Sequence, residues 1–421
     1  MPQSIQAFMD ATGIVDVHEH HIPDILLNPR VNLLQLFQQS YAGWTQARPY
    51  ALPTERRESD PMLAEAAPTT WKALAPFLER SGTNSFVRNL VRAVTELHGD
   101  GEGAITRDNW ERLDASVRQQ HQRQEWRHEV LRRAGVERLI TDPYTDPVLD
   151  ARTALGGNYN SVMRINCLAC GWHPESRDHN GNSAHTLLGR LGFKMTSFDD
   201  YLEALEKLVN GLAARHQVAL KNALAYDRDV SFDEPDEALA RAAWGKVAPS
   251  PAEKKAFGDL IVDRLCRLAG ERDVPMQMHL GTAIIRGSHP QKAAGLIERH
   301  QKTRFLLMHL AYPWSHDLLG MAFVYRNIWL DLTWSLLLSP SHFKFALHEA
   351  IEMLPDESRM MFGGDNWHVE ETYGTMKLAR RLIGEALDEK VTAGYFSVQD
   401  AERLAKKILR ENAINFFKLP V

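Results

Sequence analysis

The sequence of 421 residues is long enough for one large α/β barrel or for two to three ordinary domains. Its hydrophobic share of 44% and charged share of 24% are typical of a globular protein with a large core. A net charge of -5 offers no basic surface to nucleic acid, and no apolar run reaches the length of a membrane span. We therefore expect neither nucleic-acid nor membrane partners.

The N-terminal residues and the cysteines favour a cytoplasmic location. The polar start lacks the apolar core of a signal peptide, and three cysteines are too few for a disulfide framework. Cys167 and Cys170 form a C-x-x-C pair, but no second pair accompanies them. We interpret them as partly buried thiols rather than as a zinc or redox site.

The first strand is expected in residues 13–21, which read Gly-Ile-Val-Asp-Val-His-Glu-His-His. Because side chains alternate along a strand, His18 and His20 point the same way and Glu19 points away. Two imidazoles on one face at a strand end can bind one metal ion. Such pairs also arise by chance, so the hypothesis depends on further ligands elsewhere in the chain.

Residues 23–129 depart from strand–helix alternation. Helical patterns are expected at 31–39, 69–80, 84–97 and 107–133, with loops between them that include residues 48–53 and 98–103. A stretch of this length exceeds an ordinary strand-to-helix connection. We predict a helical insertion on the catalytic side of a barrel, and an oligomer interface is an equal alternative.

From residue 136 onward strands and helices alternate regularly. The helix that begins at Ser250-Pro-Ala-Glu has a capping box and proline at its first position. Nearly continuous apolar runs indicate strands that are buried on both faces. Together with the first strand, these later strands make eight. Eight strands that alternate with helices predict a (β/α)8 TIM barrel that forms a single domain over residues 1–421. The seven later strands are expected at 136–142, 161–168, 217–226, 274–280, 304–310, 328–333 and 359–363.

Polar side chains that could carry chemistry collect at the ends of these strands. Lys221 lies in the apolar fourth strand, His279 and His309 end the fifth and sixth, and Asp365 follows the eighth. A single histidine that closes a buried strand is more often a satisfied core residue than a ligand. Four histidines and an aspartate at four strand ends are harder to explain in that way, because barrel closure brings the ends together around one axis.

This set resembles the amidohydrolase superfamily. Leu-Lys-Asn-Ala-Leu-Ala-Tyr from 220, Pro-Met-Gln-Met-His-Leu-Gly from 275, Leu-Met-His-Leu-Ala-Tyr-Pro from 307 and Met-Phe-Gly-Gly-Asp from 361 are similar to its amidohydrolase-related branch of metal-dependent TIM-barrel hydrolases. The helical segment is similar to insertions in uronate isomerases of the same superfamily. The resemblance implies these metal ligands: His18, His20, Lys221, His279, His309 and Asp365.

The chemistry of these side chains agrees with that implication. Imidazole and carboxylate ligands suit zinc, and manganese and iron are alternatives. The ligand set would allow either one bound ion or two. Asp365 could also take a proton from the attacking water, and His309 could hold a second ion or polarise a carbonyl. In superfamily members with two metals the lysine is carboxylated and bridges them. Lys221 could equally remain an ammonium that pairs with a carboxylate or an anionic substrate.

Substrate contacts are expected from residues that follow the strands. Guanidinium groups bind carboxylates through two hydrogen bonds, and a tryptophan could form the wall of a pocket, although each residue could equally be ordinary loop or packing structure. The predicted contacts are Arg164, Tyr226, Arg228, Arg286 and Trp334.

We therefore predict a metal-dependent hydrolase that cleaves an amide, lactone or related bond of a small polar molecule with a metal-activated water. The alternative keeps the metal and changes the reaction to a nonoxidative decarboxylation or a uronate-type isomerisation. A third reading, a catalytically silent barrel that binds a ligand or partner, is disfavoured by the intact ligand set. The sequence does not decide the oligomeric state, and a homo-oligomer is compatible with it.

Overall fold

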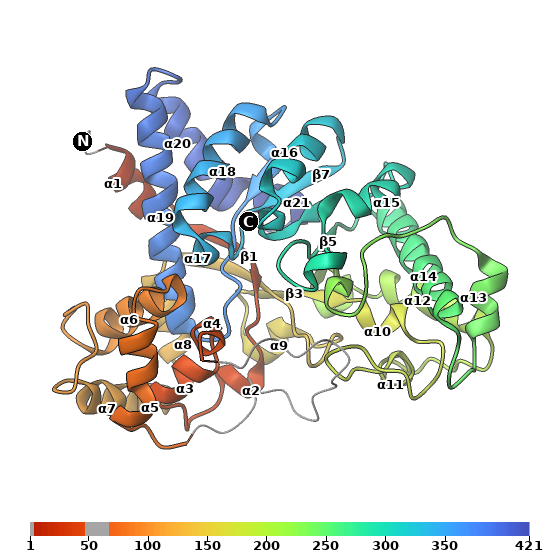
Figure 1. The fold of residues 1–421 in the computed structure, drawn as a ribbon, viewed down its shortest axis with the longest axis horizontal. Coiled ribbons are helices and arrows are strands. Elements are labelled where there is room, and N and C mark those ends of the chain that lie inside the picture. Colours follow the sequence, from red (N-terminus) through yellow and green to blue (C-terminus); the bar gives the residue numbers. More distant parts are fainter. Residues whose placement is uncertain (1–3, 47–66, 421) are drawn as a thin grey trace. The chain divides into compact units, whose positions relative to one another are not determined.

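Eight strands form one sheet in the order β1 to β8 in the computed structural model, which describes residues 4–46 and 67–420 (Figure 1). The chain directly after β8 pairs with β1, because Val17 N donates to Phe362 O at 3.2 Å and Asp365 N donates to His18 O at 2.8 Å. The fold is therefore a (β/α)8 TIM barrel, as predicted. The strands are β1 (Ile14–Glu19), β2 (Val136–Thr141), β3 (Tyr159–Arg164), β4 (Gln217–Asn222), β5 (Met276–Met278), β6 (Phe305–Leu307), β7 (Ile328–Asp331) and β8 (Met360–Met361).

The chain divides into two compact units, which are described separately. The first comprises residues 1–139, 333–348 and 362–411, and the second comprises 140–332, 349–361 and 412–421. Helix α18 (Pro340–Met353) has residues in both. The other α-helices of the first unit are α1 (Ser4–Ala11), α2 (Pro23–Leu26), α3 (Leu33–Gln38), α4 (Tyr41–Trp44), α5 (Trp71–Ala75), α6 (Ser85–His98), α7 (Trp110–His121), α8 (Trp126–Arg133), α17 (Ser335–Leu338), α19 (Val369–Thr392) and α20 (Val398–Lys406).

The second unit contains β3 to β8 and the last residues of β2. Among the residues that the structure describes, no helix in either unit is both long enough and apolar enough to cross a bilayer. The α-helices of the second unit are α9 (Ala151–Leu155), α10 (Asn166–Ala169), α11 (Ala184–Arg190), α12 (Phe198–Asn210), α13 (Glu237–Ala243), α14 (Pro251–Arg272), α15 (Ala294–Arg299), α16 (Ser315–Val324) and α21 (Asn412–Phe417).

Seven helices, α2 to α8, lie between β1 and β2 in the described part of the first unit. Helices α3 to α7 contribute to a hydrophobic core of their own, and α6 and α8 pack against α19 (Figure 1). The loop expected at residues 48–53 lies outside the described residues. The interpretation of residues 23–129 as an insertion within a single barrel domain stays a prediction. Core residues include Leu33, Leu36, Phe37, Leu74, Phe77, Val87, Leu90, Val94, Leu113 and Val117.

Local sequence signals explain where the long helices of the second unit begin. Ser250 caps α14 by accepting from Glu253 N, Pro251 occupies the first turn, and the Glu253 side chain returns the bond, which confirms the predicted capping box. Helix α12 begins with the same device at Ser197 and Asp200. Its predicted apolar face, with Leu205 and Leu208 at its centre, is buried.

Several strands are shorter than predicted, and for two of them the structure shows a local reason. Strand β6 was expected to reach residue 310 but ends at Leu307, because His309, Leu310 and Ala311 take φ values of 62°, 49° and 45° that no strand can contain. Strand β4 ends at Asn222, whose side-chain Oδ1 accepts from Leu224 N and begins a 3-10 turn. Beyond β3, the expected strand residues 166–168 instead form part of α10.

Candidate functional site

Three predicted metal ligands of the first unit lie together. His18 is fully buried at the end of β1, and its Nε2 lies 3.4 Å from Asp365 Oδ1. His20 Nε2 lies 3.2 Å from the same oxygen. Tyr41 OH donates to the other carboxylate oxygen, Asp365 Oδ2, at 2.8 Å. Two imidazole nitrogens thus converge on one carboxylate oxygen, while a tyrosine fixes the second oxygen.

Two glycines allow the chain before Asp365 to approach β1 closely. A Cβ on Gly363 would lie 2.7 Å from His18 N, and one on Gly364 would lie 2.3 Å from Glu19 Oε1. Both distances are far below ordinary contact. Asp16 Oδ1 then accepts from both His18 N and Gly364 N at 3.1 Å. Gly363 is therefore required by the close approach of two backbone segments, and Gly364 by the Glu19 side chain that lies against it.

Two buried acids on β1 support the same junction. Glu19 accepts from Asn366 Nδ2 at 3.2 Å and from Thr372 Oγ1 at 2.9 Å, which ties β1 to the start of α19. Burial raises the pKa of Asp16 to about 7, although hydrogen bonds from Glu19 and the backbone N–H of His18 lower it. Burial, together with the charge of Asp16, raises the pKa of Glu19 well above its ordinary value. These acids therefore hold less negative charge at neutral pH than two exposed carboxyls would.

In the second unit, His279 and His309 face each other directly. His309 Nε2 lies 2.9 Å from His279 Nδ1, and His279 Nε2 lies 3.1 Å from Thr282 O. The tautomers that satisfy both contacts place a proton between the two imidazoles. Two nitrogen ligands of one tetrahedral zinc ion lie about 3.3 Å apart, given zinc–nitrogen bonds near 2.0–2.1 Å. The pair is therefore close to the spacing at which an ion could replace the shared proton.

The turn after β6 aims the His309 side chain. His309 to Ala311 all adopt the left-handed conformation, and Gly281, itself at φ 86°, packs against them. A Cβ on Gly281 would lie 2.6 Å from the carbonyl carbon of Ala311, so a larger residue there would displace the turn. Gly281 thus provides the space that the turn needs.

Lys221 belongs to a buried polar layer that crosses three strands. Arg164 on β3 aligns with Lys221 on β4, and Lys221 aligns with Gln277 on β5. The Lys221 side chain is 1% exposed, and its Nζ contacts Met308 Sδ.

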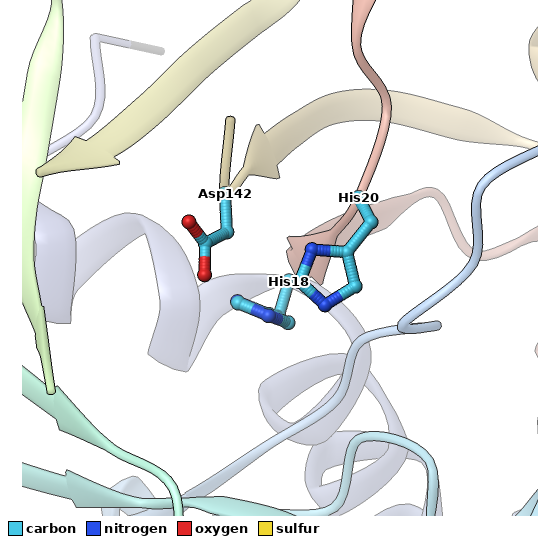
Figure 2. A group of neighbouring side chains, drawn as sticks. All are labelled: His18, His20 and Asp142. Carbon is cyan, nitrogen blue, oxygen red and sulfur yellow. The ribbon is translucent and has the colours of Figure 1, made fainter. Parts of the chain in front are cut away.

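Asp142, one residue beyond β2, is a candidate site residue that sequence reasoning missed. Figure 2 shows it with His18 and His20, and the ligand atoms of these three residues all lie within 4.8 Å of one another. Arg164 Nη2 donates to Asp142 Oδ2 at 2.6 Å and Arg164 Nε donates to Oδ1 at 3.1 Å. Burial lowers the pKa of Arg164, but the Asp142 carboxylate outweighs this effect and raises it. The Arg164 guanidinium therefore positions Asp142. Arg164 was predicted to bind substrate, and its contact with Asp142 was not anticipated from the sequence.

The structure places the other four predicted substrate contacts in different surroundings. The ring of Tyr226 lies against His279, with centroids 4.5 Å apart. Trp334 is 1% exposed and packs against Tyr41 with centroids 4.9 Å apart. Arg228 instead binds Asp259 at 2.7 Å, and Arg286 is exposed in a 3-10 turn. The substrate-binding roles of all four stay predictions, but Arg228 has a structural partner that its sequence position did not reveal.

Comparisons with known proteins identify the family to which this chain belongs. The family model for amidohydrolases matches residues 192–419, which is more than half of the chain, so this protein belongs to the amidohydrolase family. A curated relative, protein fluG of Emericella nidulans, is 25% identical over 225 residues, which are 48% of this chain and 26% of that protein. The chain thus spans about a quarter of the length of that relative.

Solved structures support the same fold over nearly the whole chain. A uronate isomerase of Thermotoga maritima matches with a TM-score of 0.76 at 16% identity, covering 98% of this chain and 96% of its own. A Lactobacillus casei protein described as a metal-dependent hydrolase matches with a TM-score of 0.67 at 17% identity, covering 99% of both chains. These matches support the TIM-barrel fold over nearly the whole chain.

Proposed function

We propose that this protein is a metal-dependent hydrolase that cleaves an amide, lactone or related bond of a small polar molecule. The observation that carries the proposal is the convergence of His18 and His20 Nε2 on Asp365 Oδ1, at 3.4 and 3.2 Å. Imidazole and carboxylate donors that meet at a buried point suit zinc, and manganese or iron less well. Asp142, His279, His309 and Lys221 are the further proposed ligands.

A divalent ion held there would act as a Lewis acid and would lower the pKa of a water molecule towards about 7. Residues of the chain would transfer the proton, hold the substrate and polarise its carbonyl group. Asp365 would take the proton of the attacking water through Oδ1, since Tyr41 already occupies Oδ2. Tyr226, whose ring lies against His279, would hold the substrate next to that imidazole. The substrate carbonyl would be polarised at the end of β6, near His309.

An alternative reaction is a uronate-type isomerisation on the same barrel. The specific observation in its favour is the uronate isomerase match, which covers 98% of this chain, although a likeness at 16% identity extends to the fold alone. A nonoxidative decarboxylation is a further alternative that the ligand set would also allow. Neither alternative adds an oxygen atom from water to its product, which separates both from hydrolysis.

Metal content provides the first test. We expect the purified protein to carry zinc or a similar divalent ion, and the His18→Ala, His20→Ala double variant to lose most of it, since two ligands are removed at once. Elemental analysis of protein purified without added metal measures this. Two ions per chain would favour a carboxylated Lys221, and one ion would favour the ammonium. An unchanged metal content in the double variant contradicts the site.

Isotope incorporation tests the reaction itself. A panel of small amides, esters, lactones and uronates is screened, and turnover is repeated in ¹⁸O-labelled water. Hydrolysis places one label in the new carboxyl group of the product, because the attacking oxygen comes from water. A product that forms without the label excludes hydrolysis and directs attention to the isomerase or decarboxylase alternatives.

A further inference from the structure

The cysteine pair at 167 and 170 is a motif that the proposed function does not use. The sequence alone favours inert thiols, because no second cysteine pair accompanies this one. In the structure both cysteines are thiols in one tight turn, where Cys170 N donates to Cys167 O at 3.3 Å. A turn of four residues brings its first and last Cα atoms within about 7 Å. Disulfides need Cα atoms about 4.4–6.8 Å apart, so the backbone of this turn suits one.

The two sulfur atoms lie near the same tyrosine hydroxyl. Cys170 Sγ–H donates to Cys167 O at 3.4 Å, which folds the Cys170 side chain back over the turn. Tyr201 OH donates to Leu168 O, between the two cysteines in sequence, at 2.6 Å. Burial raises the pKa of Tyr201 well above its usual value, and the charges of ionised Cys167 and Cys170 raise it further. One hydroxyl group that interacts with both thiols places their sulfur atoms on the same side of the turn.

The two thiols differ in exposure. Cys170 is partly exposed, whereas Cys167 is 0% exposed. Burial, together with the charges of Asp178 and Asp227, raises the pKa of Cys167 well above its usual value. Cys167 is therefore held as a thiol that solvent does not reach, and a dissolved reagent meets Cys170 first. An accessible cysteine beside a second cysteine that can resolve it is the arrangement that forms reversible disulfides.

Hydrogen bonds hold this turn in place in the folded chain. Asn166, directly before Cys167, accepts from Ala223 N at 3.0 Å and donates to Asp227 Oδ2 at 2.6 Å. These two bonds fasten the start of α10 to the segment after β4, and Tyr201 fastens its middle. A disulfide can therefore form in the folded protein by movement of the two cysteine side chains.

We propose that Cys167 and Cys170 form a peroxide-responsive dithiol, a modification site in which Cys170 reacts and Cys167 resolves. The Cys170 thiolate attacks one oxygen of hydrogen peroxide, the O–O bond breaks, and the other oxygen leaves as water after it gains a proton. The sulfenic acid that results is then attacked by the Cys167 sulfur. The S–O bond breaks, and hydroxide leaves as water with the Cys167 proton. The two sulfur atoms together lose the two electrons that reduce the peroxide, and an added dithiol reverses the modification by exchange.

The third cysteine, Cys266 on α14, provides a control within the same chain. It is fully buried, and burial raises the pKa of its thiol, as for Cys167. It has no second cysteine within one turn of the sequence. Cys266 should therefore remain a thiol under conditions that oxidise the pair, and Cys266→Ala should oxidise at 167 and 170 as the wild type does.

The test treats the folded wild-type protein with hydrogen peroxide and then counts thiols by alkylation after unfolding. We expect the count to fall from three per chain to one, since a disulfide consumes two, and dithiothreitol to restore all three. Peptide mass mapping should place the disulfide between Cys167 and Cys170. In Cys167→Ala, Cys170 should instead become a sulfenic acid that dimedone traps. In Cys170→Ser, Cys167 should stay reduced, because peroxide does not reach it.

Three alkylated thiols in the peroxide-treated wild type would overturn the proposal, and so would a Cys170 sulfinic acid that forms without any disulfide. A disulfide that forms only in urea, or one that joins two chains on a non-reducing gel, would overturn it as well, because the geometry belongs to a single folded turn. The wild-type result decides by itself, so a variant that fails to fold leaves the outcome unchanged. The measurement uses no substrate and is independent of the proposed hydrolase function.

Discussion

The Asp365→Asn variant will lose at least ~10²-fold in turnover on any substrate that the wild type hydrolyses, the usual scale for a general base. Asparagine keeps the size of the side chain and can still accept from Tyr41 OH, but it lacks the basic oxygen that faces His18 and His20. Substrate affinity should change little. Steady-state kinetics and direct binding to the metal-loaded variant measure both quantities.

Tyr41→Phe is the companion variant. It removes the hydroxyl group that donates to Asp365 Oδ2 and leaves the carboxylate in place, so we expect a loss of severalfold, well short of the effect of Asp365→Asn. An Asp365→Asn protein that binds metal and keeps more than a tenth of wild-type turnover contradicts the assignment of Asp365 as proton acceptor.

The largest effect on stability is expected at Glu370, near the start of α19. This carboxylate is fully buried, and its Oε1 accepts from His98 Nε2 at 3.2 Å, His121 Nε2 at 2.9 Å and Trp126 Nε1 at 2.9 Å. Glu370→Ala leaves three buried donors without their acceptor. We expect a loss of about 3–5 kcal/mol in the free energy of unfolding, the scale for breaking a buried charged pair.

The adjacent residue is a matched control. Glu371 is also buried, and it accepts from backbone N–H groups: those of Trp367 and His368, both at 3.2 Å, and that of Tyr41. Burial raises the pKa of Glu371 to about 8, so it is largely uncharged at pH 7, and Glu371→Gln should cost less than about 1 kcal/mol. Urea unfolding of both variants at pH 7, at equal metal loading, gives the comparison, and equal losses would contradict this account.

The two glutamates also respond to pH in opposite directions. Burial raises the pKa of Glu370, but His121 and His98 outweigh it and hold that pKa well below its ordinary value. Its stabilisation is therefore complete above the pKa of the unfolded chain and is lost as the pH falls through the folded pKa. Glu371, with its raised pKa, instead destabilises the fold as the pH rises towards about 8.

The strand ends could be predicted because their signals are local. A buried apolar strand that ends in histidine or aspartate can be recognised from a few consecutive residues, which is how His18, His279, His309 and Asp365 were found. Tyr41 had no such signal, because it lies in the helical segment and meets Asp365 across 324 positions of sequence. No periodicity could have joined these two residues.

Asp142 and Arg228 also show that tertiary contacts cannot be predicted from local sequence: Asp142 was missed, and Arg228 was predicted to bind substrate but has a structural partner. Asp142 looks like any polar residue after a strand, and only the bound Arg164 and the nearby imidazoles distinguish it. Arg228 looks like a substrate ligand after β4, yet Asp259, on a helix 31 residues later, binds its guanidinium. Tertiary packing decides which charged side chains pair, and a single sequence does not show those pairs.

The turn from His309 to Ala311 has a practical consequence for engineering heat resistance. Each side-chain-bearing residue in the left-handed conformation costs about 1–2 kcal/mol, so glycine at Leu310 or Ala311 would be the obvious stabilising design. Glycine would also free the backbone that aims the His309 imidazole, and a melting-temperature screen would score such variants as improvements. Anyone who optimises this protein for thermal tolerance should therefore leave the turn unchanged, together with Gly281 beneath it, or measure metal affinity alongside melting temperature.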